Sequence, residues 1–252
     1  MAMLARVLVT ELFKLKRTLA LWMVLIAPMV VVMLNFLVGM FGPGTPLAQS
    51  IRGPWGQITN NTVNIWTLLM MPMFLTLETS LLAGLEHTDK NWKSLLALPA
   101  PRWTFYAGKL VVTIMLLWTA HAVLMGGTVL SATILKAARP ALGFGAMPLS
   151  LLSRPLAKIS VAALFALTIQ HWVSLRWQSF TAALGFGMCA MVVSLVAVRS
   201  ATYGPWYPWS MPLVSVLVLN SRGTHVIPAA IAGSVVAALF GCWEFSRREI
   251  SS

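Results

Sequence analysis

The chain has 252 residues, of which 58% are hydrophobic and 10% are charged, and its mean hydropathy is +0.81. A soluble domain carries about 25% charged residues, so this chain has too little polar surface to cover a water-soluble particle. The composition excludes a soluble globular protein and predicts an integral membrane protein. The net charge of +12 fits basic residues that flank and orient membrane spans, rather than a surface that binds nucleic acid.

Residues 3–18 predict an amphipathic helix that lies along a membrane surface. Leucine and valine recur at helical spacing on one face and basic residues occupy the other, which suits an anionic cytoplasmic leaflet. Glu11 is unusual because it lies in the apolar face. Two interpretations stay open: Glu11 pairs within the chain with Lys14 or Lys16, or Glu11, Lys14 and Arg17 contact a partner subunit.

Six apolar runs are long enough to cross a membrane, which takes about 20 residues in a helix. They cover about 19–41, 62–85, 110–135, 159–175, 180–198 and 226–243. The first run is too long for the core of a cleavable signal, which is roughly 7–15 residues, and no A-x-A site follows it. The intervening segments predict a Gly/Pro-rich loop at 41–61, a long connection at 136–158, and a short re-entrant or interfacial piece at 213–219.

We therefore predict an all-α integral membrane protein in three parts. Residues 1–18 form the interfacial helix, 19–243 the six-span transmembrane domain, and 244–252 a polar cytoplasmic tail.

The only long polar interruption with both signs of charge follows the second run and predicts a short amphipathic helix at 86–98. Two acid–base pairs stand four residues apart with the acid first, which supports a helix: Glu86–Lys90 and Asp89–Lys93. Trp92, Leu95 and Leu96 form one apolar stripe, Pro99 ends the helix, and Arg102 follows. Such a stripe favours docking into another protein; the alternative is a helix that lies on the lipid headgroups.

Six spans place both termini on one side of the membrane. Eleven basic residues lie on that side: Arg6, Lys14, Lys16, Arg17, Lys90, Lys93, Arg102, Lys109, Arg176, Arg247 and Arg248. Seven lie on the other side: Arg52, Lys136, Arg139, Arg154, Lys158, Arg199 and Arg222. The excess predicts cytoplasmic termini. Since the outer face carries no acidic residue, we expect it to favour anionic headgroups or to discourage the return of cationic substrates.

A few polar side chains lie inside the predicted spans, where ionisable groups are functional candidates by default. Candidates for a translocation path are Asn35, Glu78, His121 and His171, with Gln170 beside the last. Two interpretations of Glu78 stay open: its side chain faces a water-filled vestibule, or it forms a structural pair with a donor from a neighbouring span. His121 and His171 are conceivable axial ligands of a haem, although their predicted depths in the membrane match poorly.

Several familiar signatures are missing from the sequence. It contains no Walker phosphate loop, no H-E-x-x-H, no G-x-S-x-G and no cluster with zinc-ligand spacing. Cys189 and Cys242 lie in apolar runs and are interpreted as packing residues. The last span carries small residues four apart, which allow close helix approach or occur by chance in an Ala-rich segment: Ala229, Gly233, Ala237 and Gly241.

Four segments together carry a resemblance to a known family. They are E-x-x-K-x-K-R from Glu11 to Arg17, E-H-x(4)-W-K-x-L-L-x-L-P-x-x-R from Glu86 to Arg102, the turn Ser174–Phe180, and Y-P-W-S-M-P from Tyr207 to Pro212. The chain resembles the six-span permease subunit of type-2 ATP-binding-cassette exporters over essentially its whole length. It is most similar to the branch linked to lantibiotic immunity and bacitracin-type resistance.

This resemblance implies a coupling helix between spans two and three and short extracellular helices before the last span. The coupling role then falls to Glu86, Lys90, Trp92, Lys93, Leu95, Leu96, Pro99 and Arg102. The implied partners are two ATPase subunits, which bind ATP and Mg²⁺, and a second permease chain, identical or related. This chain itself binds no cofactor and has no catalytic residues. The implied location is the bacterial inner membrane.

The resulting hypothesis is an ATP-driven exporter subunit that moves an amphipathic peptide, antibiotic or lipid. One rival is an intramembrane enzyme, but the sequence shows no paired nucleophile and base. The other is a haem-binding or different subunit of a membrane complex, for which the absorbance spectrum of the purified protein is decisive.

Overall fold

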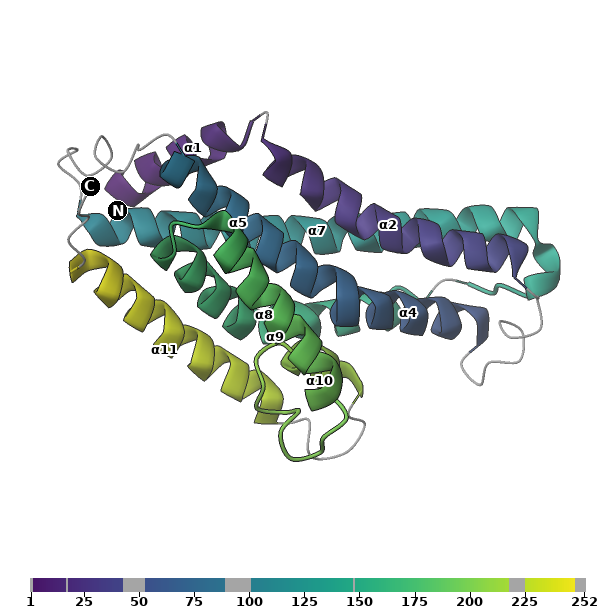
Figure 1. Cartoon of the computed structure of the whole chain (residues 1–252). Coiled ribbons are helices and arrows are strands. Elements are labelled where there is room, and N and C mark those ends of the chain that lie inside the picture. Colours follow the sequence, from purple (N-terminus) through teal and green to yellow (C-terminus); the bar gives the residue numbers. More distant parts are fainter. Residues whose placement is uncertain are drawn as a thin grey trace.

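A computed structural model describes residues 2–16, 18–42, 53–88, 101–146, 148–217 and 225–247. Six helical segments in these ranges are long and apolar enough to cross a membrane, which confirms the predicted all-α membrane fold (Figure 1). The elements in chain order are α1 (Ala2–Leu15), α2 (Leu19–Phe41), α4 (Gly53–Ile65), η1 (Trp66–Met70), α5 (Met71–Thr88), α7 (Arg102–Ala138), η2 (Pro140–Leu142), α8 (Ser150–Arg176), α9 (Phe180–Ala197), α10 (Met211–Leu217) and α11 (Val226–Arg247).

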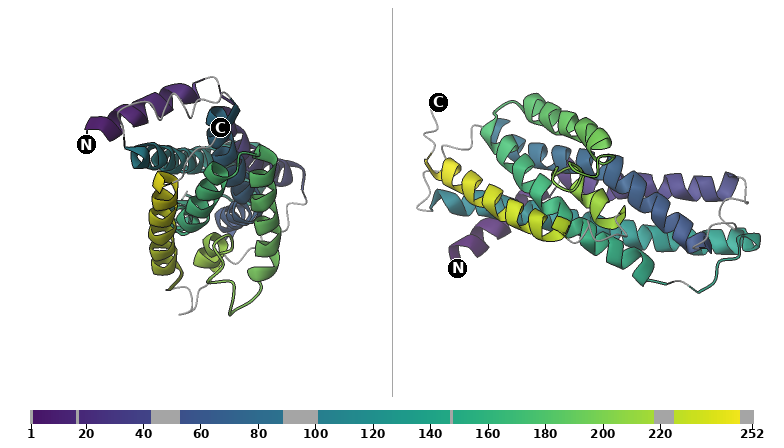
Figure 2. Two further views of the ribbon diagram at one scale, coloured as in Figure 1. Left: turned by 60° about the vertical axis from the view of Figure 1, so that its left-hand side comes forward. Right: turned by 90° about the horizontal axis from the view of Figure 1, so that it is seen from below.

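The six spans run alternately up and down. α4, η1 and α5 form one continuous span from Gly53 to Leu85. The start of α1 and the last turn of α11 lie at the same end of the molecule, and α2 and α7 reach furthest toward the opposite end (Figures 1 and 2). The main core joins α2, α5, α7 and α8 around buried side chains such as Trp66, Leu117 and Leu167.

The Gly/Pro-rich segment expected to be a loop up to residue 61 is helical from Gly53 onward. Gly53 has a positive φ of 68°, and Pro54 follows it in the first helical turn, where proline is tolerated. Trp55 and Ile58 are buried against η2 and the residues after it, and the Trp55 indole donates to the carbonyl of Gly145 at 3.3 Å. Buried contacts with a distant segment of the chain thus override the local turn signals.

The connection expected at 136–158 is also shorter than predicted. α7 continues to Ala138 and α8 begins at Ser150, so only residues 139–149 link the two helices, with η2 inside the link. The prediction ended the third span before Lys136 and began the fourth after Lys158, because both residues are charged. A helix of 37 residues is about 55 Å long at 1.5 Å per residue, against about 30 Å for the hydrocarbon core. α7 therefore passes through the polar headgroup region without a break.

Arg139 closes the end of α2. Its guanidinium donates to the backbone carbonyls of Gly39, Met40 and Gly42, each at 3.1 Å. The last carbonyls of a helix have no partner within the helix, and a cation there also complements the helix dipole. Sequence reasoning placed Arg139 on a cationic surface; in the structure its side chain satisfies a helix terminus.

Arg139→Ala is therefore expected to lower the free energy of unfolding by about 1.5–3 kcal/mol, the range for hydrogen bonds to a charged group. Thermal unfolding in detergent, followed by tryptophan fluorescence, measures this. Lys136→Ala is the matched control, because Lys136 is exposed and makes one bond, to Gly145 at 3.3 Å. Equal shifts for the two variants would contradict the capping role.

The small residues of α11 pack inside the chain. A Cβ on Gly233 would lie 2.7 Å from the Phe165 ring of α8, and one on Gly241 would collide with the Tyr106 hydroxyl of α7. Close helix approach, one of the two interpretations of this stripe, therefore occurs within the chain, between α11 and its neighbours α8 and α7. α11 also continues to Arg247, so residues 244–247 belong to a helix and not to a tail. Glu244 accepts from Arg176 and from the Trp172 indole, which joins the ends of α8 and α11.

Candidate functional site

The end of the bundle that carries the termini holds a buried ion pair between α1 and α7. The Lys109 ammonium lies 2.7 Å from Glu11 Oε2, and the two side chains are only 1% and 3% exposed. Lys14 adds a second contact at 3.0 Å to Glu11 Oε1. Of the two interpretations of Glu11, pairing within the chain is the one the structure contains, and Lys109 is the partner that sequence spacing did not reveal. Arg17 lies outside the described residues.

The segment predicted to couple to a partner lies mostly outside the described residues. This applies to Lys90, Trp92, Lys93, Leu95, Leu96 and Pro99. The flanking helices place its two ends: Glu86 belongs to the last turn of α5, which runs on to Thr88, and Arg102 is the exposed first residue of α7. The second span was predicted to end at about residue 85 and the amphipathic helix to begin at residue 86, whereas α5 continues through Glu86 to Thr88. Both flanks lie at the end that carries α1 and the last turn of α11 (Figure 1).

An aromatic cluster lies beside this end, where α7, α8 and α11 meet. The rings of Tyr106 and His171 are 5.0 Å apart and edge to face, and Phe245 contacts Tyr106 at 5.9 Å. The Tyr106 hydroxyl and His171 Nε2 are buried without a hydrogen-bond partner among the described residues. Sequence reasoning selected His171 but not Tyr106. The sequence feature connected with Tyr106 is Gly241, which has no side chain and so leaves room for the Tyr106 hydroxyl. This feature does not by itself identify Tyr106 as the neighbour.

The second span contains a helical irregularity at mid-length. η1 is a π-helical segment, and the Met71 N–H donates to the Trp66 carbonyl five residues back. Pro72 follows, and proline lacks the N–H that an α-helix requires at this point. Short π segments are frequent at functional sites. The rings of Trp66 and His121 of α7 lie edge to face, with centroids 5.6 Å apart, and His121 Nδ1 is 2.8 Å from the Ser160 hydroxyl of α8.

Glu78 of α5 is fully buried, and neither carboxylate oxygen has a hydrogen-bond partner among the described residues. The neighbouring hydroxyls form a separate polar contact with α8: the Ser174 hydroxyl donates to Thr79 Oγ1 at 3.2 Å and lies 3.4 Å from Ser80 Oγ. This conformation therefore contains neither of the arrangements considered for Glu78, a water-exposed vestibule or a pair with a neighbouring donor. Burying a carboxyl group without a hydrogen bond is costly, so Glu78 lowers the stability of this conformation.

The four path candidates are not brought together. Asn35 is bonded within α2 to the Val31 carbonyl at 3.0 Å and to Thr62 of α4 at 3.4 Å, so its role here is to join two helices. Among the described residues, no hydrogen bond connects any two of Asn35, Glu78, His121 and His171.

Shared haem ligation by His121 and His171 is excluded by distance. His121 bonds to Ser160 of α8, and His171 lies eleven residues further along the same helix, which corresponds to about 16 Å at 1.5 Å per residue. Two axial ligands of one iron lie within a few ångströms of that iron, on opposite faces of the ring. Groups of three or more His, Cys, Asp or Glu side chains suited to a metal ion are likewise absent from the part of the chain that the structure describes.

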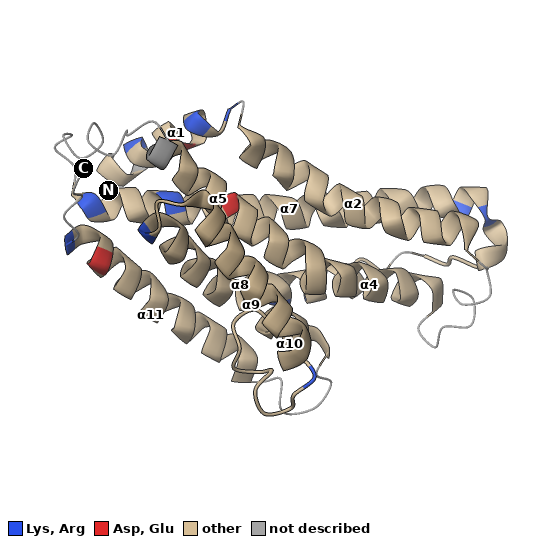
Figure 3. Ribbon diagram, in the orientation of Figure 1, with Lys and Arg blue, Asp and Glu red and all other residues tan. Residues whose placement is uncertain are grey.

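Charge is distributed unevenly along the bundle. Figure 3 shows basic residues at both ends, whereas the described acidic residues lie toward the end that carries the termini. In the sequence, no Asp or Glu occurs between Asp89 and Glu244. The opposite end is therefore cationic, as the sequence predicted.

Six helices that are long and apolar enough to span a membrane define a multi-pass membrane protein. A family model described as ABC-2 family transporter protein matches residues 7–194. This match covers well over half of the chain, and the chain belongs to that family. It is thus the membrane-spanning transport subunit of an ATP-binding-cassette system, which works with a separate ATPase subunit. Comparison with curated proteins and with solved structures gave no match.

Proposed function

We propose that this chain is the permease subunit of an ATP-driven exporter and that residues 86–102 couple it to the ATPase. ATP closure of an ATPase dimer would move this segment, and the attached helices α5 and α7 would change the access of the path between the two sides of the membrane. The observation that carries the proposal is the placement of both flanks of the segment at the end that also holds α1. The Glu11–Lys109 ion pair joins α1 to α7 at this end, so these elements would move together.

The assembly is proposed to contain two ATPase subunits, which bind ATP and Mg²⁺, and a second copy or relative of this chain. The termini are proposed to be cytoplasmic and the membrane a bacterial inner membrane, on the basis of the larger number of basic residues at the end with the termini. The substrate is proposed to be an amphipathic peptide, antibiotic or lipid, and the resemblance to the lantibiotic-immunity and bacitracin-resistance branch supports this choice.

Glu78 is the proposed path residue with the clearest physical argument. A carboxyl group without a partner in the membrane interior is tolerated where another conformation gives it water or a partner. The adjacent π segment η1 provides a place at which the second span can change its bend. We propose that α5 changes position during transport and brings Glu78 into the path, with His121 and His171 on the facing helices.

Trp92→Ala combined with Leu96→Ala tests the coupling role. Both residues lie on one face of the predicted helix, and a buried interface aromatic typically contributes about 2 kcal/mol or more. We expect the double variant to reach the membrane normally, but to recover much less ATPase on co-purification and to lose substrate-stimulated ATP hydrolysis. Trp206→Ala is the matched control, because Trp206 is 66% exposed and lies toward the opposite end.

A helix that lies on lipid headgroups would give a different result. Its double variant would recover as much ATPase as the wild-type chain and hydrolyse ATP at the same rate. That outcome would remove the coupling role from residues 86–102.

A further inference from the structure

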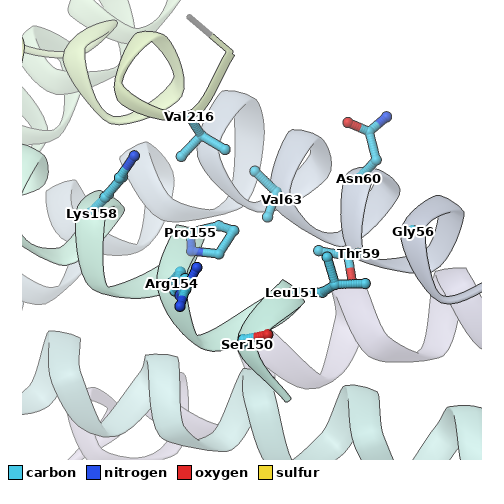
Figure 4. A pocket seen from close by; sticks show the side chains of 10 residues that line it. All are labelled: Gly56, Thr59, Asn60, Val63, Ser150, Leu151, Arg154, Pro155, Lys158 and Val216. Carbon is cyan, nitrogen blue, oxygen red and sulfur yellow. The ribbon is translucent and has the colours of Figure 1, made fainter. Parts of the chain in front are cut away.

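A pocket of about 300 Å³ lies between α4, α8 and α10, in the half of the bundle away from the termini. α8 contributes Arg154 and Lys158, one turn apart, α4 contributes Thr59 and Asn60, and Val216 of α10 closes the pocket from above (Figure 4). Arg154, Lys158 and Asn60 are exposed side chains, so the pocket opens to the surface. Its volume is at the lower end of the range for small-molecule sites.

The pocket has a strong excess of positive charge. Neither Arg154 nor Lys158 forms an ion pair with any residue that the structure describes. The sequence provides no acidic residue between Asp89 and Glu244 that could neutralise them. The Arg guanidinium and the Lys ammonium are the usual ligands of phosphate oxygens, and the Asn60 amide and Thr59 hydroxyl add neutral donors.

The position of the pocket along the spans indicates what kind of anion fits it. Beyond Lys158, α8 contains no Lys, Arg, Asp or Glu until Arg176 at its other end, and the residues between them are mainly apolar. The pocket therefore lies at the edge of the hydrocarbon layer, at headgroup level. Figure 4 shows Val63, Pro155 and Val216 between Lys158 on one side and Asn60 on the other. A polar rim and an apolar floor at this depth suit a group that carries both a phosphate and an acyl chain.

We propose that this pocket binds the phosphate group of an amphiphile in the leaflet opposite the termini. Arg154 and Lys158 hold the phosphate oxygens, Asn60 donates to them, and Val63 and Val216 contact the attached chain. The proposal is independent of ATPase coupling, because it depends only on the pocket and its charges. Binding is therefore measurable on this chain alone.

The test uses the full-length chain in a neutral detergent and three probes: short-chain phosphatidic acid, the matching diacylglycerol, and inorganic phosphate. Native mass spectrometry or thermophoresis measures binding. The pocket variant combines Arg154→Gln with Lys158→Gln. The control combines Lys136→Gln with Arg199→Gln, which removes the same charge from the same end outside the pocket. Asn60→Leu keeps both cations, and its control is Asn61→Leu, because Asn61 pairs with Gln57 of its own helix.

Wild-type and control chains are expected to bind phosphatidic acid alike and diacylglycerol weakly. The Arg154/Lys158 variant is expected to bind phosphatidic acid about tenfold more weakly or worse, as the loss of charge-assisted hydrogen bonds requires, and Asn60→Leu a few-fold more weakly. Resistance of bound phosphatidic acid to millimolar inorganic phosphate supports the amphiphile as the ligand, whereas full displacement would assign the pocket to free phosphate and overturn the role of the attached chain. Undiminished binding by the Arg154/Lys158 variant, or an equal loss in the Lys136/Arg199 control, would overturn the proposal.

Discussion

Lys109→Met is expected to destabilise the protein more than any other single charge removal in the described part of the chain. Lys109 is 1% exposed and pairs at 2.7 Å with Glu11, which is 3% exposed. Lys109→Met leaves the buried Glu11 carboxylate with only the partly exposed Lys14 as a partner, and removing one member of a buried pair typically costs about 3–5 kcal/mol. We expect a sharp fall in the melting temperature of the purified protein and in the amount of folded protein in the membrane.

A double-mutant cycle separates the ion pair from simple packing. Glu11→Gln together with Lys109→Met leaves no buried charge at this position, because Lys14 is partly exposed, so the stability of the double variant should recover well above that of Lys109→Met alone. Lys14→Ala is the matched control, because Lys14 is 30% exposed and an exposed pair contributes about 0–1 kcal/mol. Losses in the double variant that equal the sum of the single losses would show that the two charges act independently.

Gly187→Leu is expected to separate α9 from the rest of the bundle. A Cβ at Gly187 would collide with the Thr76 side chain of α5 and lie 2.8 Å from Gln170 Oε1 of α8. The Gln170 amide also donates to the α9 carbonyl of Ala183 at 2.9 Å, so movement of α9 breaks this bond as well. Overpacking of this kind costs about 1–3 kcal/mol, and a leucine at so close a contact is expected at the upper end.

The same helix offers a control for this substitution. Gly185 is exposed, and a Cβ there would have nothing within 4 Å. Gly185→Leu should therefore leave the unfolding temperature unchanged or slightly raised, since leucine favours a helix more than glycine does. If both variants unfold at the same temperature, the close approach of α9 to α5 at Gly187 is not a determinant of stability.

The number of spans could be predicted from the sequence, because crossing a bilayer requires a long apolar run and six such runs are present. The helix ends could not. Gly53–Ile65 reads as a loop by its glycine, proline and asparagine content, and only its contact with Phe144 and Leu142 shows why it is helical. Hydropathy marks where a helix leaves the hydrocarbon layer, whereas hydrogen bonding and packing decide where it ends.

For a similar reason, residues of the candidate site could be selected from the sequence, but their contacts could not be predicted. Buried ionisable residues such as Glu78 and His171 stand out in any apolar run, so they could be selected from the sequence. Their surroundings depend on which helices are neighbours, and this is a tertiary property. The pairing of Glu11 with Lys109, 98 positions away, and the contact of Tyr106 with Gly241 are both of this kind. Distances along the chain contain no information about either.

The length of α7 has a mechanical consequence. This helix has 37 residues, which makes a rod of about 55 Å, and His121 lies near its midpoint in contact with Ser160. If the rod rocks by about 10° about that midpoint, its two ends swing in opposite directions by about 5 Å each. The first residue of α7 comes shortly after residues 89–100 in the sequence. At the other end, Arg139 donates hydrogen bonds to the Gly39 and Met40 carbonyls in the last turn of α2. A displacement of α7 at one membrane surface would thus produce a displacement of equal size and opposite direction at the other surface.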